Sequence, residues 1–138
     1  MNGWLLDTNI LSELRKGRHC DAGVNVWFAG IDDGFLFTSV LVLGEIRKGI
    51  ERIRMTDASQ ARVLEKWLQA TIDNYADRIL PVDERIAEQW GRLGIRQSLP
   101  VVDALLAATA LCHDLTLVSR DTRGFLNAGI RTLNPFSS

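Results

Sequence analysis

The sequence contains few cysteines, no long hydrophobic run and almost no net charge. Its two cysteines, Cys20 and Cys112, stand apart without CxxC spacing or histidine pairs, which argues against a disulfide framework or a zinc site and predicts free thiols. The longest apolar stretch, residues 101–112, is interrupted by Asp103 and Thr109 and is too short to span a bilayer. The net charge of −1 excludes a strongly basic domain, so any binding of nucleic acid must depend on local charge.

No basic segment followed by an apolar segment precedes Asp7, so we expect no secretory signal. We therefore expect a cytoplasmic protein that does not insert into a membrane. The length of 138 residues suits one domain with a single hydrophobic core. The content of 46% hydrophobic and 24% charged residues is typical of a globular chain. We predict one domain over residues 1–138.

Segments with the pattern of strands and helices alternate along the chain. Apolar runs bounded by polar turns predict strands at residues 4–6, 35–38, 79–82, 116–119 and 130–133. Apolar residues three or four positions apart predict helices at residues 10–17, 24–31, 40–53, 58–77, 83–93 and 98–111. In the helix at 58–77 the predicted inner face consists of Val63, Leu64, Trp67, Leu68 and Ile72. This alternation predicts an α/β fold, with a parallel sheet of about four to five strands and helices on both faces.

Four acidic side chains are placed where they can converge at one edge of this sheet. Asp7 directly follows the first predicted strand, and Asp121 comes just after the fourth. Ligands of α/β proteins bind in the crevice beyond the carboxyl ends of the strands. Asp103 falls in the first turn of the helix that begins near Pro100, and Glu45 lies early in the helix after the second strand. The order of the elements therefore predicts a cluster of carboxylates.

Each acid also has a purely structural explanation. Asp7 can cap the following helix, and Asp103 can complement the helix dipole. Glu45 can pair with Lys48 at i,i+3 spacing, and Asp121 can serve as a turn residue. Only the joint placement of the four acids favours a functional site.

Carboxylates that converge in a dry crevice raise one another's pKa, and a divalent cation relieves their repulsion. Oxygen ligands without His or Cys suit Mg²⁺ or Mn²⁺. Such an ion activates a water molecule and neutralises charge on a phosphodiester. Hydrolysis of a nucleic-acid backbone is therefore the predicted chemistry.

Several segments, taken in order, match a known pattern. They are LLDTNI at 5–10, Ser39 through GEI at 44–46, DALLAATA at 103–110, LVSRD at 117–121 with Phe125, and LNPF at 133–136. Together they resemble, almost from end to end, the PIN-domain toxins of the VapC and FitB kind, which are the toxin halves of type II toxin–antitoxin pairs.

This resemblance implies a metal-dependent endoribonuclease that hydrolyses RNA with a metal-activated water, using Mg²⁺ or Mn²⁺ as cofactor. The residues implied to be both catalytic and metal-binding are Asp7, Glu45, Asp103 and Asp121. Behind them, Thr8 and Asn9 would steady the first turn, and Ser119 would hold a carboxylate or a metal-bound water.

The resemblance also implies three partners: an RNA substrate, a cognate VapB- or FitA-like antitoxin, and a second copy of the chain in a homodimer. Two short basic runs, residues 15–19 and 47–54, lie beside predicted acids, although a solvated face explains either run alone. The candidates for contacts with RNA phosphates are Arg15, Lys16, Arg47 and Lys48.

The chain departs from the family pattern at two positions. Many relatives have Asn at the position of Asp121 and an acid directly before the Phe, where this chain has Gly124, so the fourth acid is Asp121 or absent. Relatives tend to have Thr where this chain has Ser119, which preserves the hydroxyl group.

Other functions remain as alternatives. A non-cleaving PIN-fold module that binds RNA or protein is the main one, although such a module has no need for four clustered acids. A phosphotransferase of the haloacid-dehalogenase type would have DxD at the first turn, where this chain has DTN at 7–9. A receiver-like switch lacks its expected acidic pair and lysine.

Overall fold

The computed structural model describes residues 2–96, 98–126 and 128–137. Its strands form one parallel sheet in the order β3-β2-β1-β4-β5. The strands are β1 (Trp4–Leu6), β2 (Leu36–Ser39), β3 (Ile79–Leu80), β4 (Thr116–Val118) and β5 (Thr132–Leu133). The predicted α/β fold with a parallel sheet is confirmed.

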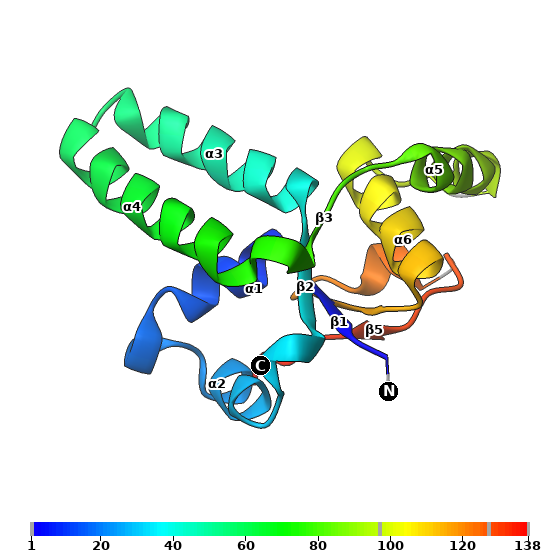
Figure 1. Ribbon diagram of the computed structural model, residues 1–138, viewed down its shortest axis with the longest axis horizontal. Helices are drawn as coiled ribbons and strands as arrows, with labels where there is room; N and C mark the ends of the chain where they lie inside the picture. Colours follow the sequence, from blue (N-terminus) through cyan, green and yellow to red (C-terminus); the bar gives the residue numbers. More distant parts are fainter. Residues whose placement is uncertain (1, 97, 127, 138) are drawn as a thin grey trace.

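The helices form two groups around this sheet. The α-helices are α1 (Thr8–Leu14), α2 (Ala22–Ala29), α3 (Val40–Arg54), α4 (Ala58–Tyr75), α5 (Glu84–Arg96) and α6 (Val101–His113). Short 3-10 turns are η1 (Gly17–His19), η2 (Asp33–Phe35), η3 (Ala76–Arg78) and η4 (Arg123–Phe125). In Figure 1 the α3–α4 hairpin and the α5–α6 pair lie on opposite sides of the strands. No helix within the described ranges is long and apolar enough to cross a bilayer.

The strand order explains where a ligand site forms. The chain moves outward from β1 to β2 and β3, then crosses back so that β4 pairs with the other edge of β1. This reversal places helices on both faces, because crossovers between parallel strands are right-handed. It also opens a crevice at the carboxyl ends of β1 and β4, which is the usual ligand site in such sheets.

The two central strands lie inside the core. Leu5, Leu6, Leu117 and Val118 are fully buried, as expected for parallel strands covered on both faces. The register pairs Leu6 with Val118, so the two strands end side by side. The next residues, Asp7 and Ser119, therefore emerge together at one edge.

The element boundaries differ from the prediction in ways that local structure explains. Helix α1 begins at Thr8 rather than Ile10, because the Asp7 side chain accepts a hydrogen bond from the Thr8 backbone N–H and caps the helix. It ends at Leu14, before Gly17, which has a positive φ of 59°. The edge strands β3 and β5 are shorter than predicted, with two residues each.

One part of the predicted core was wrong. Val63 is 57% exposed, whereas Leu64 and Leu68 are buried as predicted, and Trp67 and Ile72 pack at the margin of the core. The buried stripe of α4 consists of Ala61, Leu64, Leu68, Thr71 and Tyr75. The helix is thus rotated relative to the prediction, and smaller or polar side chains take the place of Val63 inside.

Candidate active site

Asp7 lies at the centre of the site, between the end of β1 and the start of α1. The Thr8 backbone N–H donates to its Oδ1 at 2.7 Å, and the Ser119 hydroxyl donates to its Oδ2 at 2.8 Å. Burial raises the pKa of Asp7, the two hydrogen bonds oppose this rise, and the nearby charge of Glu45 adds to it. The cap predicted as a structural role is confirmed, and the same carboxylate faces the cavity described below.

A second set of hydrogen bonds links the β1–α1 turn to the end of β4. The Asn9 side-chain amide donates to Ser119 Oγ at 3.3 Å, and its Oδ1 accepts from the Arg120 backbone N–H at 3.0 Å. Ser119 is 1% exposed, so its hydroxyl is shielded from water. These contacts fix the position and direction of the Asp7 carboxylate.

Glu45 approaches Asp7 from helix α3. Its Oε1 accepts a hydrogen bond from the Thr8 hydroxyl at 2.7 Å. Within the described residues Glu45 forms no ion pair with Lys48, so the purely structural explanation considered for this acid does not hold. The exposed carboxylate is oriented toward the β1–α1 turn instead.

Asp103 and Asp121 complete the acidic cluster. Asp103 lies in the first turn of α6, and its pKa is raised by burial and then by the charges of Asp7, Glu45 and Asp121. Asp121 is exposed, and its Oδ1 accepts from the backbone N–H and the side-chain Nε of Arg123, both at 3.3 Å. Its predicted role as a turn residue is therefore also present.

All four acids line one cavity of about 540 Å³. Also in its lining are Thr8, Asn9, Ser12, Ser119, Gly124 and Phe125. Sequence reasoning did not single out Ser12 as a site residue, although its position one turn after Thr8 on the same helix was a usable signal. The convergence inferred from the strand ends is thus present in the structure.

The chemistry of this cavity fits a hard divalent cation. Its ligands would be carboxylate and hydroxyl oxygens, and a cation would reverse the repulsion that contributes to the raised pKa values of Asp7 and Asp103. In the part of the chain that the structure describes, no three His, Cys, Asp or Glu side chains are grouped closely enough to hold an ion.

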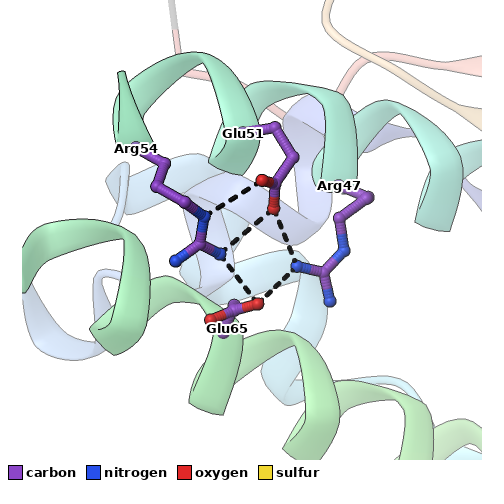
Figure 2. Close-up of polar contacts among 4 residues, drawn as sticks. All are labelled: Arg47, Glu51, Arg54 and Glu65. Atoms are coloured by element: carbon purple, nitrogen blue, oxygen red, sulfur yellow. Dashed lines mark hydrogen bonds and ion pairs between the residues drawn. The ribbon is translucent and has the colours of Figure 1, made fainter. Parts of the chain in front are cut away.

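None of the four candidates for RNA phosphates lines this cavity, and three of them are engaged elsewhere. Arg47 pairs with Glu51 at 3.2 Å and with Glu65 of α4 at 2.7 Å. Figure 2 shows these three side chains together with Arg54, which contacts both acids from the other side. The ion pairs of the two arginines with Glu65 join α3 to α4.

The two candidates from the first basic run, residues 15–19, also contact other side chains of the chain. Lys16 pairs with Glu13 at 2.9 Å, and the Arg15 guanidinium lies 5.9 Å from the centre of the Trp67 ring. Only Lys48 lines a groove next to the acidic cavity, together with Arg52, which sequence reasoning had not chosen as a phosphate contact.

The fold and the site define an α/β domain with an acidic cavity at the reversal point of its parallel sheet. The chain belongs to the PIN-domain family, whose family model matches residues 4–130.

Comparisons with individual proteins agree with this assignment. The chain is 29% identical to Toxin FitB of Neisseria gonorrhoeae, over 96% of this chain and 97% of FitB. It is 28% identical to VapC ribonuclease Y4jK of Sinorhizobium fredii, over 96% of each chain. The crystal structure of FitAcB from Neisseria gonorrhoeae superposes with a TM-score of 0.84 at 29% identity, covering 96% of this chain and 97% of the other.

Proposed function

We propose that this protein is a metal-dependent endoribonuclease and the toxin of a toxin–antitoxin pair. The observation that carries the proposal is the cavity in which Asp7, Glu45, Asp103 and Asp121 come together from four separate parts of the fold. The names of the relatives, a toxin and a VapC ribonuclease, support RNA as the substrate and toxicity as the consequence.

The four acids would hold Mg²⁺ or Mn²⁺, which would supply activation of the attacking water and neutralise charge on the phosphodiester. The residues of the chain do the remaining work. Ser119 and the Thr8 N–H orient Asp7 and favour its ionised form against the effect of burial, since both donate to its oxygens. Thr8 holds Glu45 through its hydroxyl, and Asn9 holds Ser119. Asp121 lines the cavity and is exposed, so solvent reaches this part of the site and would supply the proton for the departing oxygen.

The proposal includes partners. A VapB- or FitA-like antitoxin would block the cleft, as suggested by the toxin names of the relatives. The proposal also includes a homodimer. It further includes a cytoplasmic location, since the cytoplasm is where the protein would meet RNA.

A non-cleaving PIN-fold module is a second candidate. It is favoured by the observation that the acids of the described residues are not already grouped to hold an ion. Replacement of Asp7 separates the two functions, because a nuclease loses cleavage and retains RNA binding, whereas a binding module has no cleavage to lose.

The test is cleavage of total cellular RNA by purified protein, freed of any co-purified partner, with Mg²⁺ or Mn²⁺ and with EDTA. Asp7→Asn is compared with Asp77→Asn, which changes an exposed acid that does not line the cavity. Discrete metal-dependent products from wild type and Asp77→Asn, but not from Asp7→Asn, support the proposal. Absence of cleavage by folded, metal-loaded wild type contradicts it.

A further inference from the structure

A second cavity, a groove of about 660 Å³, runs along helix α3 beside the acidic cavity. Thr8 and Glu45 line both, so the groove continues directly from the place where the acids meet. Its volume lies in the range of about 300–1,000 Å³ that is typical of ligand pockets. A polymer whose backbone passes the acids would enter this groove on one side.

The charges on this stretch of α3 are divided by face. Arg47 and Arg54 are paired with acids between α3 and α4 (Figure 2). Lys48 and Arg52 both line the groove, and their i,i+4 spacing places them on one face. Both are exposed, and among the described residues neither side chain makes a hydrogen bond or an ion pair. The groove therefore offers a ligand two cationic side chains that are in no ion pair, with Glu45 in the lining where the groove meets the acidic cavity.

Two glycines in the interior of α3 also line the groove, Gly44 and Gly49. Glycine is a poor helix former, and a Cβ added at either position would meet no atom within 4 Å. Packing within the protein thus gives no reason for glycine here. Bare backbone at these positions permits the close approach of something outside the chain.

The remaining wall is apolar. Val40 is 41% exposed, and Leu41 and Val102 lie beside it in the lining. Apolar surface next to a row of cations complements a ligand with a charged backbone and flat apolar faces. Unpaired nucleotides have both, whereas a duplex buries the faces of its bases.

We propose that this groove binds the single-stranded segment of RNA that adjoins the bond to be cut. Lys48 and Arg52 contact its phosphates, the apolar wall contacts base faces, and the bare helix at Gly44 and Gly49 allows the strand to lie close. The inference rests on the proposed function for the position of the cut, but binding in the groove is measurable without cleavage.

The first experiment measures binding of a fluorescent single-stranded RNA of about ten nucleotides by anisotropy, in the Asp7→Asn background so that cleavage does not interfere. We expect Lys48→Gln and Arg52→Gln each to lower the salt slope of log K by about 0.7, which is about fivefold in affinity at 0.1 M salt relative to 1 M. The matched control is Lys66→Gln, an exposed cation on α4 that lines neither the groove nor the acidic cavity.

The second experiment fills the groove. Gly44→Gln adds a side chain that leans toward the start of α3 and away from Glu45, because helical side chains point back along the helix. We expect the Tm to rise by about 2–5 °C and RNA binding to weaken by about tenfold or more. Gly91→Gln is the matched control, because Gly91 lies within α5 with equally open space around it. It should raise the Tm similarly and leave binding unchanged, which excludes unfolding as the reason for lost binding.

The outcomes separate this inference from the nuclease proposal. Unchanged affinity and salt slope in both cation variants, or unchanged binding in Gly44→Gln, would overturn it, as would equal affinity for a duplex. If an acidic peptide binds in the groove without displacing RNA, the groove belongs to a protein partner, and the inference is overturned. If the variants weaken RNA binding while wild type cuts no RNA with any metal, the inference about the groove is supported and the nuclease proposal fails.

Discussion

Replacing Ser119 by Ala should reduce stability in a manner that depends on pH. The Ser119 hydroxyl donates to the Asp7 carboxylate at 2.8 Å in a buried position. Loss of a hydrogen bond to a charged group costs about 1.5–3 kcal/mol, and to a neutral group about 1 kcal/mol. With an unfolding entropy of about 2.1 cal/mol/K for each residue, the neutral-pH cost corresponds to a fall in Tm of about 5–10 °C.

The sign of the pH dependence follows from Asp7. Its pKa is already raised by burial, and the bond from Ser119 lowers it, so loss of the hydroxyl raises the pKa further. The destabilisation is therefore largest at a pH above the folded-state pKa values of Asp7 in the two proteins. It shrinks as the pH falls through the folded-state pKa values toward the ordinary value of 3.8, because the carboxyl becomes protonated in the folded state.

The assay is thermal and urea unfolding of both proteins at several pH values between neutral and about pH 4. Ser39→Ala is the matched control, since Ser39 is equally buried but its hydroxyl accepts from the neutral Leu41 backbone N–H at 3.0 Å. Its loss should cost about 1 kcal/mol at every pH. A loss in Ser119→Ala that does not vary with pH would refute the reasoning.

Three further predictions follow from the same site and from the core. Asp7→Asn should be more stable than wild type at neutral pH without added metal, and the difference should vanish as the pH falls through the raised pKa of Asp7, because wild type then loses its buried charge; equal pH profiles from urea unfolding would contradict this. Mg²⁺ or Mn²⁺ at about 100 times its Kd should stabilise wild type by about 2.7 kcal/mol, less so at acidic pH, where the ligands are protonated; an equal Tm shift in Asp7→Asn would show that Asp7 is not a ligand. Leu64→Ala should lower the free energy of unfolding by about 2–4 kcal/mol and Val63→Ala by less than about 0.5 kcal/mol, because Leu64 is buried and Val63 is exposed; similar losses in the two variants would mean that α4 buries Val63, as the sequence predicted.

Much of the site could be predicted because it depends on the ends of strands. Asp7 and Asp121 follow β1 and β4, and parallel pairing brings the ends of neighbouring strands to one edge whatever the details of packing. The role of Ser119 came from the family resemblance, and the pairing of Leu6 with Val118 explains why Ser119 lies beside Asp7. Helical periodicity likewise located α3 and α4 to within a few residues.

Other features depend on contacts between distant segments, which a single sequence does not encode locally. The bond from Thr8 to Glu45 spans 37 residues, and the local alternative, Glu45 with Lys48, looked equally good. Arg47 was predicted to contact phosphate although Glu51 at i+4 was a local sign of pairing, and its shorter ion pair is with Glu65 on another helix, 18 residues away. Val63 was misplaced because two apolar stripes, one residue apart, fit α4 almost equally well.

The measurement that tests the central claim most directly is the rate and product chemistry of cleavage of an end-labelled single-stranded RNA as Mn²⁺ is titrated into EDTA-stripped protein in solvent enriched in oxygen-18. We predict metal-dependent cleavage by wild type, none by Asp7→Asn, and linear phosphomonoester ends carrying one solvent oxygen, since water is the nucleophile. Cleavage that proceeds equally in EDTA, or that yields a 2′,3′-cyclic phosphate by attack of the RNA 2′-hydroxyl, would contradict a hydrolysis that depends on the four carboxylates.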